Sequence, residues 1–157
     1  MQTRLSSSYT VRFSDCDPLG HLNNARYIDY FLNAREDHMK ENYQIDLKEF
    51  AAKGIGWVVT AHEIQYIRPV VYNDRVTIQS EMIEVGDFHL LVEMLMFDEP
   101  AENLKAIMWT RFTHISLKTG KREPHSAEFM DFAKTTLSPG RDVQGGQRAR
   151  IEELMKR

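Results

Sequence analysis

The sequence has 157 residues, of which 42% are hydrophobic and 27% are charged, and its formal net charge is −3 at pH 7. This length suits a single domain, and the composition is ordinary for a soluble globular protein. A slightly acidic chain gives no electrostatic reason to expect nucleic acid or an anionic membrane as a partner. The single cysteine, Cys16, excludes an internal disulfide and fits a reducing compartment.

The N-terminal segment 1–9 is polar and lacks the apolar core of a signal peptide. No apolar run approaches the ~20 residues that are needed to cross a bilayer. We therefore expect a cytoplasmic protein with no membrane partner.

The first part of the chain predicts a strand, a loop and a helix. Residues 9–13 alternate as a short strand does, and residues 14–20 are rich in turn formers. Residues 24–42 follow a helical pattern, apolar on nearly every side in the first two turns and polar later. We expect this helix to enter the core at its N-terminal end and to leave it at its C-terminal end. A second short helix is predicted over 46–53, ending at Gly54.

The middle of the chain predicts four consecutive strands separated by turn residues. The strands cover residues 57–68, 75–85, 88–97 and 104–117. Short turns between consecutive strands favour antiparallel pairing, and a sheet that covers an apolar helix should curl around it. The sequence therefore predicts a layered α+β domain. The open edges of such a sheet favour a dimer over a monomer.

The end of the chain predicts a short helix and a tail. Residues 127–134 form the helix, with Ser126 as its cap. Beyond it, glycine and proline interrupt regular structure and few apolar residues remain. We expect one domain over residues 1–134 and a tail over 135–157 that is mobile or forms a weak helix from about Gln147.

The most informative segment, residues 12–27, precedes the main helix and brings together carboxylates, an imidazole and two carboxamides. The start of a helix offers unpaired N–H groups and the positive end of the helix dipole, which can stabilise the oxyanion of a reacting thioester. A carboxylate in the preceding loop could attack the carbonyl carbon or take a proton from water. The alternative is an ordinary loop in which Asn23 or Asn24 caps the helix.

The run Asp15-Cys-Asp-Pro-Leu-Gly-His-Leu-Asn-Asn-Ala-Arg-Tyr27 resembles the opening of the 4-hydroxybenzoyl-CoA thioesterase-like group of hotdog proteins. It is also similar to the His-Val-Asn-Asn-x-x-Tyr segment of acyl-acyl-carrier-protein thioesterases. The resemblance continues in order and length to about Ser126. It implies the hotdog fold, a curled antiparallel sheet wrapped around one long buried helix. It also implies hydrolysis of acyl thioesters, carried by CoA or by acyl-carrier protein, with no metal and no cofactor.

The resemblance also implies catalytic roles. The second Asp of the Asp-Cys-Asp segment is catalytic in the hydroxybenzoyl-CoA group, which points to Asp17, and a backbone amide at or near Asn24 would polarise the carbonyl. In the carrier-protein thioesterases Asp, Asn and His at alternate positions are implicated. Asp17 and His21 match the first and third, whereas Leu19 departs from the second. We therefore expect His21 to support Asp17.

The same resemblance suggests substrate-binding residues at the helix start and on the strand that the implied fold places beside it, although Tyr27 and Trp57 are residue types that more often belong to the core. They are Asn23, Tyr27, Gly56, Trp57 and Val58. The hairpin over residues 84–89 has no Lys or Arg where the hydroxybenzoyl-CoA enzyme binds the nucleotide phosphates. Either other cations bind CoA, or the acyl group arrives on a carrier protein.

Two alternatives remain open beside thioester hydrolysis. The first is a non-catalytic acyl-CoA-binding domain on the same scaffold. The second is a hotdog enoyl-thioester hydratase, whose pattern has Asn before His, whereas here His21 precedes both asparagines.

Cys16 is a poor nucleophile because it lies between two carboxylates, and no residue spacing is typical of zinc. A homodimer or a dimer of dimers is expected.

Overall fold

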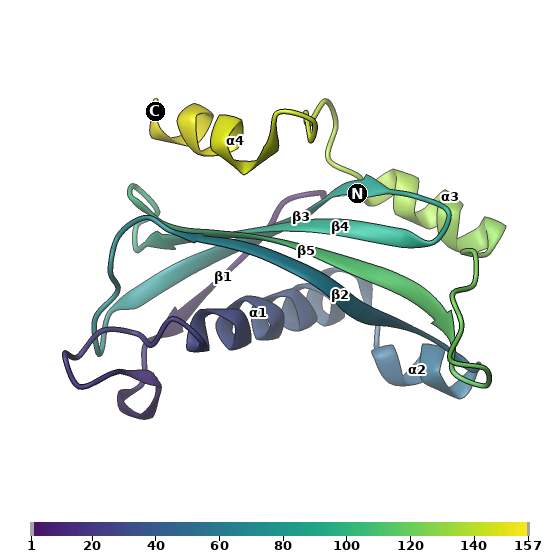
Figure 1. The fold of residues 1–157 in the computed structure, drawn as a ribbon, viewed down its shortest axis with the longest axis horizontal. Helices are drawn as coiled ribbons and strands as arrows, with labels where there is room; N and C mark the ends of the chain where they lie inside the picture. The colour runs from purple at the N-terminus through teal and green to yellow at the C-terminus, as the bar shows by residue number, and fades with distance from the viewer. Residues whose placement is uncertain (1, 157) are drawn as a thin grey trace.

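A computed structural model describes residues 2–156, which form one curled five-stranded sheet and four α-helices (Figure 1). The elements are β1 (Leu5–Thr10), a 3₁₀ turn (Phe13–Asp15), α1 (Arg26–Tyr43), α2 (Leu47–Ala52), β2 (Ile55–Tyr66), β3 (Arg75–Val85), β4 (His89–Asp98), β5 (Leu104–Ser116), α3 (Ala127–Thr136) and α4 (Gly146–Met155). All neighbouring strands are antiparallel, in the order β1-β3-β4-β5-β2. The predicted α+β hotdog architecture is confirmed.

A first strand precedes the loop as predicted, but its predicted bounds, residues 9–13, were wrong. Strand β1 runs over Leu5–Thr10, where each residue from Leu5↔Ser80 to Thr10↔Arg75 pairs with β3. The three consecutive serines in it carry no alternation, so only pairing with an existing strand edge identifies this segment as β-structure. Phe13 already belongs to the 3₁₀ turn and is exposed.

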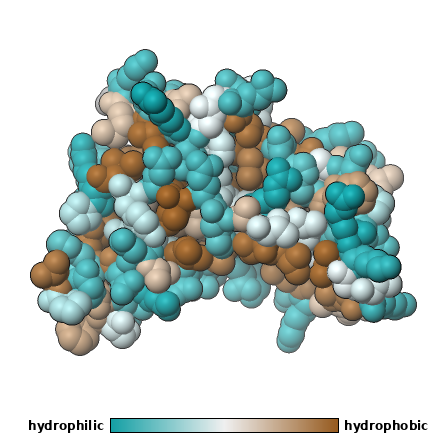
Figure 2. Space-filling view, viewed as in Figure 1, coloured by the Kyte–Doolittle hydropathy of each residue, from teal (hydrophilic) through white to brown (hydrophobic). Residues whose placement is uncertain are grey.

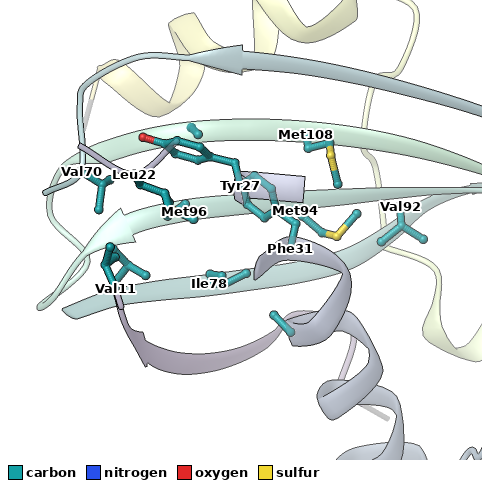
Figure 3. Close-up of a cluster of buried hydrophobic side chains, with 13 residues drawn as sticks. Val11, Leu22, Tyr27, Phe31, Val70, Ile78, Val92, Met94, Met96 and Met108 are labelled. Carbon is teal, nitrogen blue, oxygen red and sulfur yellow. The ribbon is translucent and has the colours of Figure 1, made fainter. Parts of the chain in front are cut away.

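Helix α1 crosses the concave face of the sheet, and the main core lies between them (Figure 1). Tyr27, Phe31 and Ala34 face the sheet at helical spacing. Figure 3 shows Tyr27 and Phe31 among side chains from the strands and loops; those that it labels are Val11, Leu22, Val70, Ile78, Val92, Met94, Met96 and Met108.

Helix α1 leaves the core at its C-terminal end as expected, since residues 40–42 are exposed, but it does so later than the sequence pattern predicted. Arg35 and His38, in the polar part of the sequence pattern, are buried. Both can be buried because their side chains hydrogen-bond to Ser80 on β3.

The convex face of the sheet carries a second apolar cluster, to which α4 contributes Leu154 (Figure 1). In its middle, Arg150 of α4 donates hydrogen bonds to both carboxylate oxygens of Glu93, and Trp109 Nε1 donates to the same group. The helix therefore attaches to the sheet through apolar and charged contacts alike. The division into a domain over 1–134 and a tail over 135–157 stays a prediction. In the part of the chain that the structure describes, no helix combines the length and apolar character needed to span a membrane.

Candidate active site

The loop between β1 and α1 is a compact, hydrogen-bonded unit. Isolated β-bridges join Cys16 to Leu22 within the loop, and His21 to Val71 in the segment after β2. The chain reverses at Gly20, whose φ of +78° is a conformation that glycine adopts without strain. The loop backbone is thereby held both to itself and to the segment after β2, so its side chains have defined positions.

Asp17 is held within this loop by its own side chain. Its Oδ1 accepts hydrogen bonds from the backbone N–H groups of Leu19, at 2.9 Å, and of His21, at 3.0 Å. No hydrogen bond within residues 2–156 engages Oδ2. One carboxylate oxygen therefore positions the group, and the other makes no hydrogen bond within the described residues.

The start of α1 adjoins this carboxylate. The Asn23 side chain accepts a 3.0 Å hydrogen bond from the Ala25 N–H, so it shapes the chain entering the helix. The Asn24 N–H has no hydrogen-bond partner among the described residues, whereas the Asn24 carbonyl accepts a 2.7 Å bond from the Tyr66 hydroxyl. A free amide at the positive end of a helix is a suitable donor to an oxyanion.

A hollow of about 230 Å³ opens between these groups. It is lined by Asp17, His21, Leu22, Asn24, Tyr27, Tyr66, Ile67, Arg68 and Pro69. The rings of Tyr27 and Tyr66 meet edge to face, with centroids 5.0 Å apart. Burial raises the pKa of both tyrosines, so each hydroxyl stays protonated at neutral pH.

Sequence reasoning missed Tyr66 and Arg68. Both lie at the end of the predicted strand just before Pro69, and their approach to the helix start depends on the curl of the sheet. The signal in the sequence is weak, since an aromatic residue and a cation beside a proline also occur at ordinary strand ends.

Three of the expected substrate-binding residues, Gly56, Trp57 and Val58, lie at the other end of β2. Tyr66 lies nine positions after Trp57, which on a strand is about 30 Å. Trp57 Nε1 donates a 3.0 Å hydrogen bond to His125 Nε2, and its ring packs edge to face on Phe50, with centroids 5.0 Å apart. A single chain therefore does not bring these three residues to Asp17.

Other polar groups of the loop have structural partners. Asp15 accepts a 2.6 Å hydrogen bond from the Tyr30 hydroxyl. Burial and the charges of Asp15 and Asp17 raise the pKa of the Cys16 thiol, which disfavours the nucleophilic thiolate. Within residues 2–156, no group of three or more His, Cys, Asp or Glu side chains is placed to hold a metal ion.

Comparison with known proteins extends these observations. The model of the thioesterase-like superfamily matches residues 11–133. The long-chain acyl-CoA thioesterase FadM of Escherichia coli (strain K12) is 31% identical over 121 residues, which cover 77% of this chain and 87% of FadM.

Two solved structures also resemble the chain. The probable thioesterase YbaW of Escherichia coli superposes with a TM-score of 0.73 at 28% identity, covering 85% of this chain and 98% of YbaW. The DHNA-CoA thioesterase of Staphylococcus aureus superposes with a TM-score of 0.76 over 99% of this chain and 95% of its own, at 17% identity, a likeness of fold.

Proposed function

The chain belongs to the thioesterase-like superfamily and hydrolyses acyl thioesters, and from this premise we propose that the site around Asp17 acts on acyl-CoA. The observation that carries the proposal is that Asp17 and Asn24 line the same hollow, and that Asp17 Oδ2 and the Asn24 N–H make no hydrogen bond within residues 2–156. The first is a base or nucleophile, and the second is an oxyanion donor.

In the proposed reaction the thioester carbonyl oxygen lies against the Asn24 N–H, which polarises the carbonyl bond. Oδ2 of Asp17 attacks the carbonyl carbon or takes a proton from the water that does so. The negative charge that develops on oxygen is stabilised by the Asn24 amide and by the helix dipole. If Asp17 is the base, the carbon–sulfur bond breaks as the tetrahedral intermediate collapses, the proton taken from water passes from Asp17 to the thiolate, and the free acid leaves. If Asp17 is the nucleophile, the thiolate leaves and takes a proton from water, and a further water molecule hydrolyses the acyl-Asp17 anhydride to the free acid and restores the carboxylate.

The remaining residues of the hollow have supporting roles in this proposal. The His21 imidazole orients water or the substrate, and Tyr27 forms part of the wall. Asn23 does not line the hollow, and its side-chain oxygen accepts from the Ala25 N–H, so in this proposal it shapes the loop. Arg68 supplies a cation that can bind a phosphate of CoA. The hairpin over residues 84–89 has no Lys or Arg for this purpose.

The proposed substrate is a long-chain acyl-CoA, on the strength of the name and 31% identity of FadM. The test is release of free CoA from a series of acyl-CoAs and from the same acyl groups on carrier protein. Asp17→Asn is expected to lower kcat at least ~100-fold, the scale of a positioned acid–base group. Asp15→Asn is the matched control, since Asp15 is a carboxylate of the same loop that binds Tyr30.

Three outcomes would contradict this proposal. Tight retention of acyl-CoA with no release of thiol would indicate a non-catalytic binding domain. Hydration of an enoyl-CoA in place of hydrolysis would indicate the hydratase. An Asp17→Asn variant that hydrolyses acyl-CoA at the rate of the Asp15→Asn control would remove Asp17 from the mechanism.

We further propose that the working form is a homodimer joined along β2, in the cytoplasm, where a free Cys16 stays reduced. Strand β2 is an edge of the sheet, and Val58 and Val59 on it are 41% and 43% exposed. An apolar band crosses this face in the region of β2 and α1 (Figure 2). Exposed edge strands of this kind pair with other chains.

Antiparallel pairing of two β2 strands would bring residues 56–58 of one copy towards the helix start of the other. Light scattering after size exclusion should give the mass of a dimer, or of a tetramer if two dimers associate. Val59→Lys should shift the mass towards the monomer and reduce hydrolysis. A wild-type monomer with full activity would contradict the dimer.

A further inference from the structure

Trp57, near the start of β2, is packed among aromatic rings at the end of the sheet that carries α2 and α3 (Figure 1). Its ring centroid lies 5.0 Å from those of Phe50, His114 and Phe129, which belong to α2, β5 and α3. Within residues 2–156, the indole N–H makes one hydrogen bond, of 3.0 Å, to His125 Nε2. A hydrogen bond is directional, so His125 fixes the orientation of the indole.

Two hydrogen bonds determine the protonation state of His125. Its Nδ1 lies 2.9 Å from the Gly86 carbonyl oxygen, which can only accept, so Nδ1 carries the proton. An indole N–H can only donate, so Nε2 accepts from Trp57 through its lone pair. The ring is therefore neutral, in a single tautomer. A second proton, on Nε2, would face the indole N–H, and the hydrogen bond to Trp57 would be lost.

The position of His125 opposes this second proton. The residue is only 8% exposed, and its backbone N–H donates a 2.8 Å hydrogen bond to the Asp87 carbonyl, which holds it in place. It directly precedes Ser126, the cap of α3, where the positive end of the helix dipole disfavours a cation. The neutral ring is thus the form that the fold favours.

Charged and titratable groups lie on the elements around His125. They are His114 of β5, His89 of β4 with Glu84 of β3 bonded to it, Asp87 of the turn between β3 and β4, Arg122 and Glu123 of the segment before α3, and the exposed Glu128 of α3. Burial lowers the pKa of His125, and the charges of His114 and His89 lower it further, against the Gly86 hydrogen bond and the Asp87 charge. The ring therefore takes up a proton only below the ordinary range of imidazole, which is near pH 6.5.

We propose that His125 is a positioning residue for Trp57, and that protonation of His125 in mild acid releases the indole and weakens substrate binding at Asp17 of the other copy. The inference rests on the proposed function and on the β2–β2 dimer, which brings residues 56–58 of one copy towards the helix start of the other. His125 does not line the Asp17 hollow, so it acts through Trp57. Because Trp57 belongs to a wall and not to the reacting groups, the effect of His125 should appear in KM and not in kcat.

The indole itself reports the change. In protein labelled with 15N-tryptophan, Trp57 and Trp109 each give one indole N–H signal in a nuclear magnetic resonance spectrum, and Trp57→Phe assigns the two. Between pH 7.5 and pH 4.5 the Trp57 signal should shift, with a midpoint below about pH 6.5, because its acceptor is lost. The Trp109 signal should keep its position, since Trp109 Nε1 donates to Glu93. A Trp57 signal that does not move over this range would overturn the proposal.

His125→Gln is the matched variant. Its amide can accept from Trp57 and donate to Gly86, and it does not titrate. The Trp57 signal should therefore be independent of pH in this variant. His89→Gln removes an imidazole that is bonded to Glu84, and it should retain the titration of Trp57. If the Trp57 signal of His125→Gln shifts as in the wild type, the signal follows another group and the proposal is overturned.

Hydrolysis of palmitoyl-CoA measures the consequence for the site. At pH 7.5, His125→Leu should raise KM about 2- to 10-fold, the range of one neutral hydrogen bond, and His125→Gln should restore the wild-type value. One pH unit below the midpoint of the Trp57 titration, the KM of the wild type should exceed that of His125→Gln by about the same 2- to 10-fold. The other histidines are present in both proteins, so this comparison isolates His125. Equal KM values at that pH would overturn the positioning role, and they remain informative if His125→Leu does not fold.

The tests of His125 and of Asp17 are separable. Asp17→Asn should keep the Trp57 titration, because the hydrogen bond between Trp57 and His125 lies within one copy. Hydrolysis by Asp17→Asn therefore tests the reaction alone. A Trp57 titration without a change in KM would overturn the positioning role and leave the assignment of Asp17 standing.

Discussion

The hydroxyl of Tyr66, at the end of β2, donates a 2.7 Å hydrogen bond to the backbone carbonyl of Asn24, just before α1. The same ring packs edge to face against Tyr27 in the first turn of that helix. An edge strand thereby holds the helix start at two points. The Asn24 amide, on the same short segment of backbone, is positioned by these contacts.

Replacement of Tyr66 by Phe removes the hydroxyl and keeps the ring packing. We expect kcat for acyl-CoA hydrolysis to fall about 2- to 10-fold, the range of one neutral hydrogen bond, because the Asn24 amide loses a restraint. Tyr72→Phe is the matched control, since Tyr72 is exposed and lines no part of the Asp17 hollow. Equal kcat in the two variants would show that the Tyr66 bond does not position the site.

His21 holds Asp17 through its backbone N–H and not through its ring. His21→Ala therefore keeps both hydrogen bonds to Asp17 Oδ1 and removes only the imidazole. We expect a loss in kcat of about 10-fold, smaller than the ~100-fold loss for Asp17→Asn. The measurement is steady-state hydrolysis at saturating acyl-CoA. If His21→Ala lowers kcat as much as Asp17→Asn does, the His21 imidazole is as important to hydrolysis as the Asp17 carboxylate.

Local sequence signals predicted most of the fold. Alternation gave the bounds of β3 without error, and the helix caps Asp46 and Ser126 accept the hydrogen bonds that their residue types favour. The predicted site residues Asp17, His21, Asn24 and Tyr27 line one hollow, because residues that are close in the sequence of a tight loop are also close in space.

Contacts between distant segments could not be predicted in the same way. Tyr66 reaches Asn24 across 42 residues, and Arg150 reaches Glu93 across 57. Neither pair has a periodic signal, because each depends on the curl of the sheet or on where α4 lies. The burial of Arg35 and His38 could not be predicted from the sequence either, because polar side chains are expected to face solvent. Both are buried here because each has a hydrogen-bond partner, Ser80, on β3.

The buried His38 predicts a loss of stability in acid. Burial, together with the nearby Arg35 cation, lowers the pKa of His38 to about 4. The unfolded chain therefore takes up a proton near pH 6.5 that the folded chain refuses until about pH 4, so stability falls as the pH drops through this window. Between pH 7 and pH 5 the loss from His38 is about 2 kcal/mol.

His38→Gln removes the titration and retains an amide that can bond Ser7 and Ser80. Urea unfolding at pH 7 and pH 5 should show that the variant loses about 2 kcal/mol less than the wild type does. Some loss remains, because burial also lowers the pKa of His125. If the free energy of unfolding falls by the same amount between pH 7 and pH 5 in the variant and in the wild type, His38 protonates without disturbing the fold.

The pair of Arg150 and Glu93 predicts a large effect of a substitution far from the Asp17 hollow. Both side chains are buried, and three N–H···O contacts of 2.9–3.1 Å join them. Arg150→Met strands the Glu93 carboxylate in an apolar layer, so the free energy of unfolding should fall by about 3–5 kcal/mol.

Two further variants show whether the loss of stability in Arg150→Met comes from the unpaired Glu93 charge or from weaker packing of α4 on the sheet. Arg148→Met, on the exposed side of the same helix, should change stability by less than about 1 kcal/mol. Adding Glu93→Leu to Arg150→Met removes the stranded carboxylate and should recover much of the loss, because a buried ion pair gains little over an apolar pair. Urea unfolding measures all three. If the double variant is as unstable as Arg150→Met, the loss comes from the contacts of α4 with the sheet and not from an unpaired charge.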